Sequence, residues 1–174
     1  MSFISSDGTG KVDATSYTTL AYANTYADSF FDEASWLLWD ATADSTKERY
    51  LNRATLYINT TYTFVGDRSS STQSLEWPRD DAFDSEGDAV TGIPSAIKQA
   101  TVLSAKRLLN STELSPDLER GGNIISEKVD VITIVYAQGA SSYTKFTEIE
   151  NLLRTSGLIE ANRNSIVNAR LTLR

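Results

Sequence analysis

The chain has 174 residues, of which 40% are hydrophobic and 22% are charged, a composition typical of a single globular domain. It contains no cysteine and no histidine, which excludes disulfide bonds, thiolate metal sites and most hydrolytic triads. The net charge of -7 disfavours sequence-independent binding to nucleic acid, because that binding depends on neutralising phosphates with Lys and Arg.

The N-terminal segment should contain an arm followed by a helix. Residues 1–16 are rich in Ser, Gly, Thr and Asp and have no apolar period, which indicates a flexible arm, or an arm that only a partner orders. From Thr19 onward, apolar residues recur every three or four positions as far as Phe31. This spacing predicts a helix whose start is capped by Thr18 or Thr19.

A second helix and a long loop are expected next. After a short segment at 36–39, the S-T-K-E sequence at 45–48 has the spacing of a capping box and predicts a helix start. That helix should end near Tyr62, because the β-branched threonines around it weaken the helical period. Residues 63–92 are rich in Gly, Pro, Ser and Asp without a lasting period, so we expect a loop that has a function or is ordered by a neighbouring subunit.

The second half should add a central helix and the β component. A third helix is predicted from Pro94 to Leu109, and its broad apolar surface places it at the centre of a small bundle. The β-branched run at 129–136 predicts a strand. A fourth helix is expected from Thr144 to Thr155, with a glycine two residues later as its stop.

The C-terminal residues alternate between apolar and polar, which predicts a half-buried strand over 166–173. Its apolar face is formed by Val167, Ala169, Leu171 and Leu173. The strand could pair with the strand at 129–136 or dock on a sheet edge of another chain. The predicted fold is therefore mainly α with a minor β component. It consists of an arm at 1–16, a helical bundle at 17–157 that includes the loop, and a C-terminal arm at 158–174.

The loop carries the candidate sites. Its acidic residues at 80–88 match no register of an EF-hand, so we expect no metal, no cofactor and no catalytic residue. Most aromatic residues fall on apolar stripes and are expected in the core. Trp77 differs because it stands beside Pro78 and Arg79 in irregular chain, where it must pack back onto the helices or anchor a neighbouring subunit.

Several segments together resemble a known family. These are S-Y-T-T-L-A-Y-A-N-T-Y at 16–26, W-L-L-W at 36–39, K-E-R-Y-L-N-R-A-T at 47–55, Q-S-L-E-W-P-R at 73–79 and I-P-S-A-I-K-Q-A at 93–100. In this order they resemble a phage family often labelled DnaT-like single-stranded DNA-binding, which is similar to the head-tail connector adaptors of tailed phages. The Q-x-L-x-W-P-R element followed by I-P is the most specific part of the resemblance.

The resemblance implies a structural adaptor that forms a ring, commonly dodecameric, beneath the portal protein. Such a protein would be located in the neck of the virion after synthesis in the host cytoplasm. It would bind the portal and a tail component, and the genome would pass through it without specific binding. We therefore expect Gln73, Leu75, Trp77, Pro78 and Arg79 to form a subunit-contact loop, and the C-terminal strand to dock on a partner.

Two alternatives stay open. The first is a single-stranded DNA-binding module used in phage replication, in which Trp77 and tyrosines stack on bases while Arg68 and Arg79 hold phosphates. The acidic charge counts against it. The second is a carboxylate-dependent enzyme, for which no motif is present.

Overall fold

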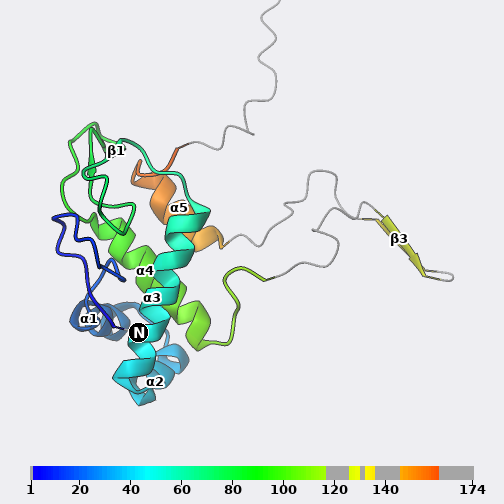
Figure 1. The fold of residues 1–174 in the computed structure, drawn as a ribbon. Coiled ribbons are helices and arrows are strands. Elements are labelled where there is room, and N and C mark those ends of the chain that lie inside the picture. Colours follow the sequence, from blue (N-terminus) through cyan, green and yellow to red (C-terminus); the bar gives the residue numbers. More distant parts are fainter. Residues whose placement is uncertain (1, 117–125, 130–131, 136–145, 161–174) are drawn as a thin grey trace, which may run out of the picture.

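The computed structural model describes residues 2–116, 126–129, 132–135 and 146–160 (Figure 1). The helices in this part of the chain are α1 Leu20–Phe30, α2 Glu33–Ala41, α3 Asp44–Thr61, α4 Ser95–Leu109 and α5 Thr147–Thr155. The strands are β1 Asp67–Arg68, β2 Arg79–Asp80, β3 Ser126–Val129 and β4 Ile132–Val135, paired antiparallel as β1-β2 and β3-β4. The predicted fold class, mainly helical with a minor β component, is confirmed.

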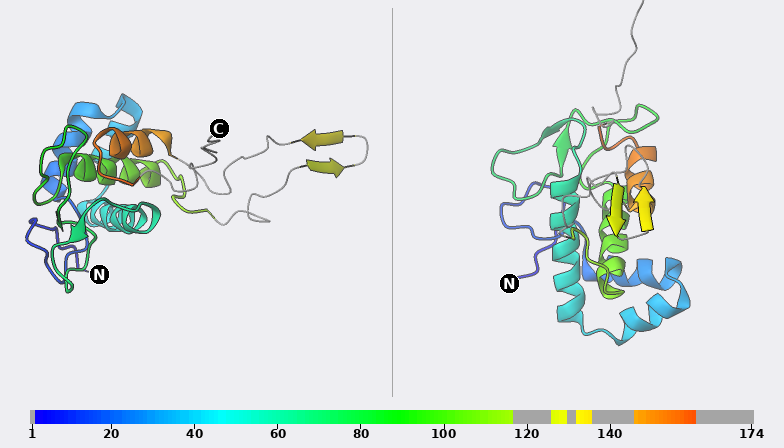
Figure 2. Two further views of the ribbon diagram at one scale, coloured as in Figure 1. Left: turned by 90° about the horizontal axis from the view of Figure 1, so that it is seen from above. Right: turned by 90° about the vertical axis from the view of Figure 1, so that its right-hand side faces the viewer.

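Helix α4 forms the centre of the bundle. All side chains from Ala100 to Ala105 are buried, because the helix contacts α1, α2, α3 and α5. Figure 2 shows α4 between α3 on one side and α5 on the other. The prediction of a central third helix is confirmed, although Pro94 is its N-cap rather than its first residue.

The buried side chains form two clusters. One joins α1, α2, α3 and α4 through small and aromatic residues, including Ala23, Ala27 and Trp39. The other joins α3, α4 and α5 to the loop, and includes Ile58 and Ile97. Each fully buried Ile or Leu stabilises the fold by about 1.5–3 kcal/mol, so both clusters contribute substantially.

The helix starts test the capping predictions. Thr19 caps α1, since its side chain accepts a hydrogen bond from the Tyr22 amide at 3.1 Å. The predicted capping box at 45–48 is wrong: α3 begins at Asp44, its N-cap is Ala43, and no side chain caps it. Asp44 lies in the first turn instead, where its charge interacts favourably with the helix dipole. The segment at 36–39 belongs to a helix, α2, that the periodicity alone did not predict.

The loop at 63–92 is attached to its own chain at several points. Phe64 forms an antiparallel bridge with Ile159, and the Val65 amide donates to the Leu158 carbonyl at 3.1 Å. Strands β1 and β2 pair within the loop. A small hairpin follows at 82–90, in which the Val90 amide donates to the Ala82 carbonyl at 2.9 Å. The chain therefore orders much of this loop itself.

The N-terminal residues fold into a hook against the loop. The Thr15 amide donates to the Ile4 carbonyl at 2.7 Å, and Ser5 pairs with Ser16. Ser74 of the loop then donates its hydroxyl to the Ala14 carbonyl at 2.7 Å. The segment expected to be a flexible arm thus makes regular hydrogen bonds within the chain.

The strand predicted at 129–136 is present, but its bounds were wrong. The run at 129–136 contributes β4 at Ile132–Val135, but residues 126–129 form a partner strand that the sequence reading did not identify. Helix α5 begins at Thr147, and Gly157 with φ +74° follows its C-cap, as expected for a helix stop. The predicted C-terminal strand with Val167, Ala169, Leu171 and Leu173 lies outside the described residues.

Candidate nucleic-acid interface

The Q-x-L-x-W-P-R motif is built into the core. Trp77 is 1% exposed and its ring meets Phe64 edge-on with centroids 6.0 Å apart. Leu75 and Pro78 are buried as well. The bond between Trp77 and Pro78, where the loop bends, is cis.

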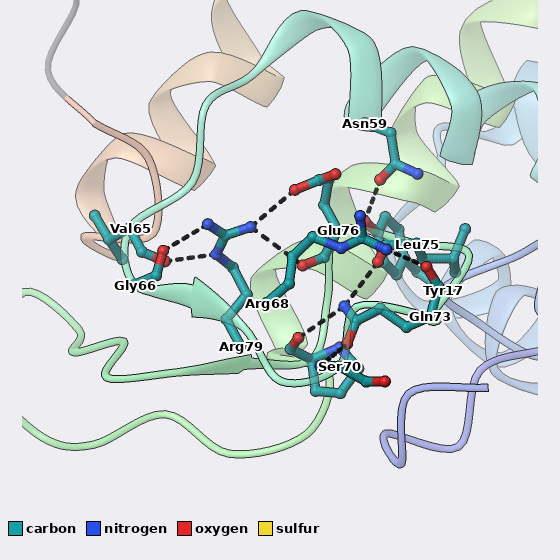
Figure 3. A network of polar contacts seen from close by, with 11 residues as sticks. Tyr17, Asn59, Val65, Gly66, Arg68, Ser70, Gln73, Leu75, Glu76 and Arg79 are labelled. Atoms are coloured by element: carbon teal, nitrogen blue, oxygen red, sulfur yellow. Dashed lines mark hydrogen bonds and ion pairs between the residues drawn. The ribbon is translucent and has the colours of Figure 1, made fainter. Parts of the chain in front are cut away.

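Gln73 holds this bend together through its buried amide. Its Nε2 donates to the carbonyls of Leu75 at 2.8 Å and Pro78 at 3.0 Å, while its Oε1 accepts from the Ser70 amide at 3.0 Å (Figure 3). Because the side chain is 3% exposed, each of these bonds satisfies a group that water cannot reach.

Arg79 clamps the loop to its own start. Its guanidinium donates to the carbonyls of Val65 at 2.8 Å and Gly66 at 2.5 Å, and it forms an ion pair with Glu76 at 2.8 Å (Figure 3). Arg68 donates to the Gln73 carbonyl in the same network. The guanidinium groups of Arg68 and Arg79 thus donate to backbone carbonyls of the same loop.

These positions alter the roles that the sequence suggested. Trp77 packs back onto the helices, so its ring is not available for base stacking, and the guanidinium of Arg79 is occupied by backbone oxygens. The assignment of phosphate binding to Arg79 is therefore wrong. The proposal that Gln73, Leu75, Trp77, Pro78 and Arg79 contact another subunit stays a prediction, and within one chain they form an internal support.

The acidic loop residues form a turn. Asp84 Oδ1 accepts from the amides of Glu86 and Asp88, both at 2.9 Å. Among the described residues, no group of three or more acidic side chains is arranged to hold a metal ion. Within the same residues, no helix is long and apolar enough to cross a bilayer.

An aromatic row lies along α1. Tyr22, Tyr26 and Phe30 follow one another at intervals of four residues, and their ring centroids are 6.4 Å and 4.7 Å apart. The Tyr22 and Tyr26 rings lie within 19° of parallel, and those of Tyr26 and Phe30 within 33°. Tyr22 and Tyr26 are half-buried, whereas Phe30 is 68% exposed. We call these three residues the aromatic row.

Two lysines of α4 lie close to aromatic rings at α1. Lys98 Nζ is 5.9 Å from the Tyr22 ring centroid, and Lys106 Nζ is 4.9 Å from that of Phe31. The Tyr22 end of the row therefore has an amine beside it, and a second amine lies over Phe31, next to the last ring of the row. Lys106 is paired with Asp32 at 2.7 Å, while Lys98 forms no ion pair within the described part of the chain.

Burial and a nearby charge both affect the pKa of Tyr26, the middle residue of the row. Burial raises the pKa of Tyr26, and the nearby Glu148 carboxylate adds to this effect. Glu148 is itself paired with Arg107 at 3.0 Å, which offsets its charge. The Tyr26 hydroxyl thus stays protonated and can donate a hydrogen bond.

The sequence reading placed Tyr26 and Phe30 on an apolar stripe and assigned most tyrosines to the core. The interval of four that adds Tyr22 was visible in the sequence. What the sequence could not show is that Phe30 stays largely exposed, or that α4 brings Lys98 beside Tyr22.

Comparison with known proteins decides the family. The family described as "Putative DnaT-like ssDNA binding protein" matches residues 1–172. The chain belongs to this family. No curated protein and no solved structure matches it.

Membership in the DnaT-like family corrects the expected function. The head-to-tail adaptor reading, with a ring beneath the portal, portal and tail partners and no specific DNA contact, is wrong, because the family is described by single-stranded DNA binding. The physical reason is that the motif on which the adaptor reading depended consists of core residues. Such a motif can identify the family through its fold without implying a portal or tail partner.

Proposed function

We propose that this protein binds single-stranded DNA by stacking bases on the aromatic row of α1. The observation that carries the proposal is the row itself: neighbouring rings at 6.4 Å and 4.7 Å, ending in the exposed Phe30. Stacking on aromatic rings tolerates any base, since every base has a π-face, and contributes about 1–3 kcal/mol per base. The family description supports the same ligand.

Lys98 of α4 supplies the electrostatic contribution to binding. Lys98 has no carboxylate partner in the described structure and stands beside the first ring of the row, where it can neutralise a phosphate. Such contacts are local, so the net charge of -7 does not prevent them. Each nucleotide carries one base and one phosphate, so a strand whose bases stack on the row brings phosphates within reach of Lys98.

The test is a titration of fluorescently labelled oligo-dT followed by anisotropy at low and physiological salt. Phe30→Ala should weaken binding by about 5- to 150-fold, the equivalent of one lost stacked base. Since Phe30 is 68% exposed, the substitution should leave folding unchanged, which circular dichroism can verify.

Phe83→Ala is the matched control. Phe83 is 52% exposed but lies in the acidic hairpin, outside the row, so this variant should bind like the natural protein. The proposal is refuted if the natural protein does not bind oligo-dT, or if Phe30→Ala and Phe83→Ala bind equally well.

A further inference from the structure

Helix α3 turns a second basic surface away from the aromatic row. Its exposed positions Arg49, Arg53, Leu56 and Thr60 recur every three or four residues, so they share one side of the helix. The opposite side carries the buried Leu51, which belongs to the cluster that holds α1. We call the exposed side the arginine face.

The charge of the arginine face is not compensated by the protein. Arg49 and Arg53 are four residues apart, a spacing at which like charges on a helix repel. The positions three and four residues away from either arginine hold no acidic residue. Arg49 donates one hydrogen bond to the Thr46 hydroxyl at 2.9 Å, and Arg53 has no polar partner within the described residues.

Most other basic residues in the described part of the chain have a carboxylate partner; Lys98 and Arg68 do not. Six of them form ion pairs with carboxylates, namely Lys11, Lys47, Arg79, Lys106, Arg107 and Arg154. The chain has 23 acidic residues against 16 basic ones, so a carboxylate partner is easily supplied. Arg49 and Arg53, which lie one helical turn apart and have no carboxylate partner, are therefore suited to bind an anion from outside the molecule.

We propose that the arginine face binds backbone phosphates of the same DNA strand that stacks on the aromatic row; this inference rests on the proposed function. Guanidinium groups bind phosphate oxygens in a two-point geometry, and a pair one helical turn apart can hold neighbouring phosphates. The exposed face offers Leu56 and Thr60 but no aromatic ring, so it contacts the backbone and no base.

The position of this face sets the length of DNA that is needed. Leu51 and Ala54 pack in the same cluster as Ala23 and Ala27 of α1, so the arginine face points away from α1. Figure 2 shows α3 as an outer helix, with α4 on its inner side. A strand that contacts both surfaces would pass around α3, so we expect an oligonucleotide that covers only the row to leave the arginines unoccupied.

The experiment measures the salt dependence of binding for a 30-mer and a 5-mer of oligo-dT, using the double variant R49Q/R53Q. Each lost phosphate contact lowers the slope of log affinity against log salt by about 0.7 for a single strand, so the 30-mer slope should fall by about 1.4. The 5-mer slope and affinity should not change. Thermal stability should be equal or higher, because the repulsion between the arginines is removed.

The matched control is the double variant K11Q/R154Q, which removes the same charge from two residues that are at least partly exposed and are paired with carboxylates. Its 30-mer slope should stay close to that of the natural protein. If R49Q/R53Q and K11Q/R154Q give the same slope while the natural protein binds, the inference is wrong and the proposed function stands. If the natural protein binds neither oligonucleotide, both are wrong.

Discussion

The internal role of Trp77 can be tested by comparing two substitutions at this position. The side chain is 1% exposed and packs edge-on against Phe64, so Trp77→Ala leaves a large cavity. Removing a buried Trp side chain costs about 3–5 kcal/mol of unfolding free energy. A domain is typically stable by only about 5–15 kcal/mol, so this variant should be severely destabilised.

Trp77→Phe should behave differently because of the indole nitrogen. Trp77 Nε1 is buried and has no hydrogen-bond partner among the described residues. The smaller ring loses about 1–2 kcal/mol of packing, but removing the unpaired donor returns about 1–3 kcal/mol. The two effects offset each other, so Trp77→Phe should lie within about 1 kcal/mol of the natural protein.

The assay is urea unfolding followed by far-ultraviolet circular dichroism, which does not depend on the tryptophan that is replaced. The expected order of midpoints is natural protein and Trp77→Phe together, with Trp77→Ala well below them. Equal stability of Trp77→Ala and the natural protein would refute the internal role. Equal losses for both variants would show that Nε1 has a partner in the folded protein.

Three further outcomes follow from the fold. Arg79→Lys should cost about 1–3 kcal/mol of unfolding free energy, since an amine cannot span the two carbonyls and the carboxylate that the guanidinium reaches, and urea titration measures this. Gly66→Ala should cost more than about 2 kcal/mol in the same assay, because φ is +73° and a Cβ would stand 2.4 Å from the Asp80 carbonyl oxygen; a loss under 0.5 kcal/mol would contradict this geometry. Asp32→Asn should flatten the fall of Tm in acid. Hydrogen bonds from Lys106 and Ser35 hold the pKa of Asp32 in the folded protein below its ordinary value of 3.8. The ionised carboxylate therefore stabilises the fold at pH values above 3.8, and this stabilisation is lost as the pH falls below that value. An unchanged acid limb would contradict that role.

The helices were largely predictable because their packing follows local periodicity. The stripe from Thr19 and the apolar run after Pro94 both led to the correct helices. The start of α3 was not predictable from S-T-K-E, since the dipole interaction of Asp44 allows a helix to begin without a side-chain cap.

The loop and the candidate site depended on contacts distant in sequence. Ser74 bonds to Ala14, sixty positions away, and Phe64 pairs with Ile159, so no local pattern indicates how the loop folds. Composition correctly marked Trp77 as unusual but could not choose between an interior and an exposed ring. The aromatic row likewise required knowledge of which side of α1 stays uncovered.

The hairpin at 82–90 offers a practical site for labelling. Gly87 lies at its tip, where an added Cβ would meet no atom within 4 Å, and the neighbouring Ser85, Glu86 and Asp88 are exposed. Because the chain has no cysteine, a single cysteine introduced at Glu86 could carry a fluorophore without competing thiols. A dye there would report on the protein during DNA titrations while leaving both the aromatic row and the arginine face unmodified.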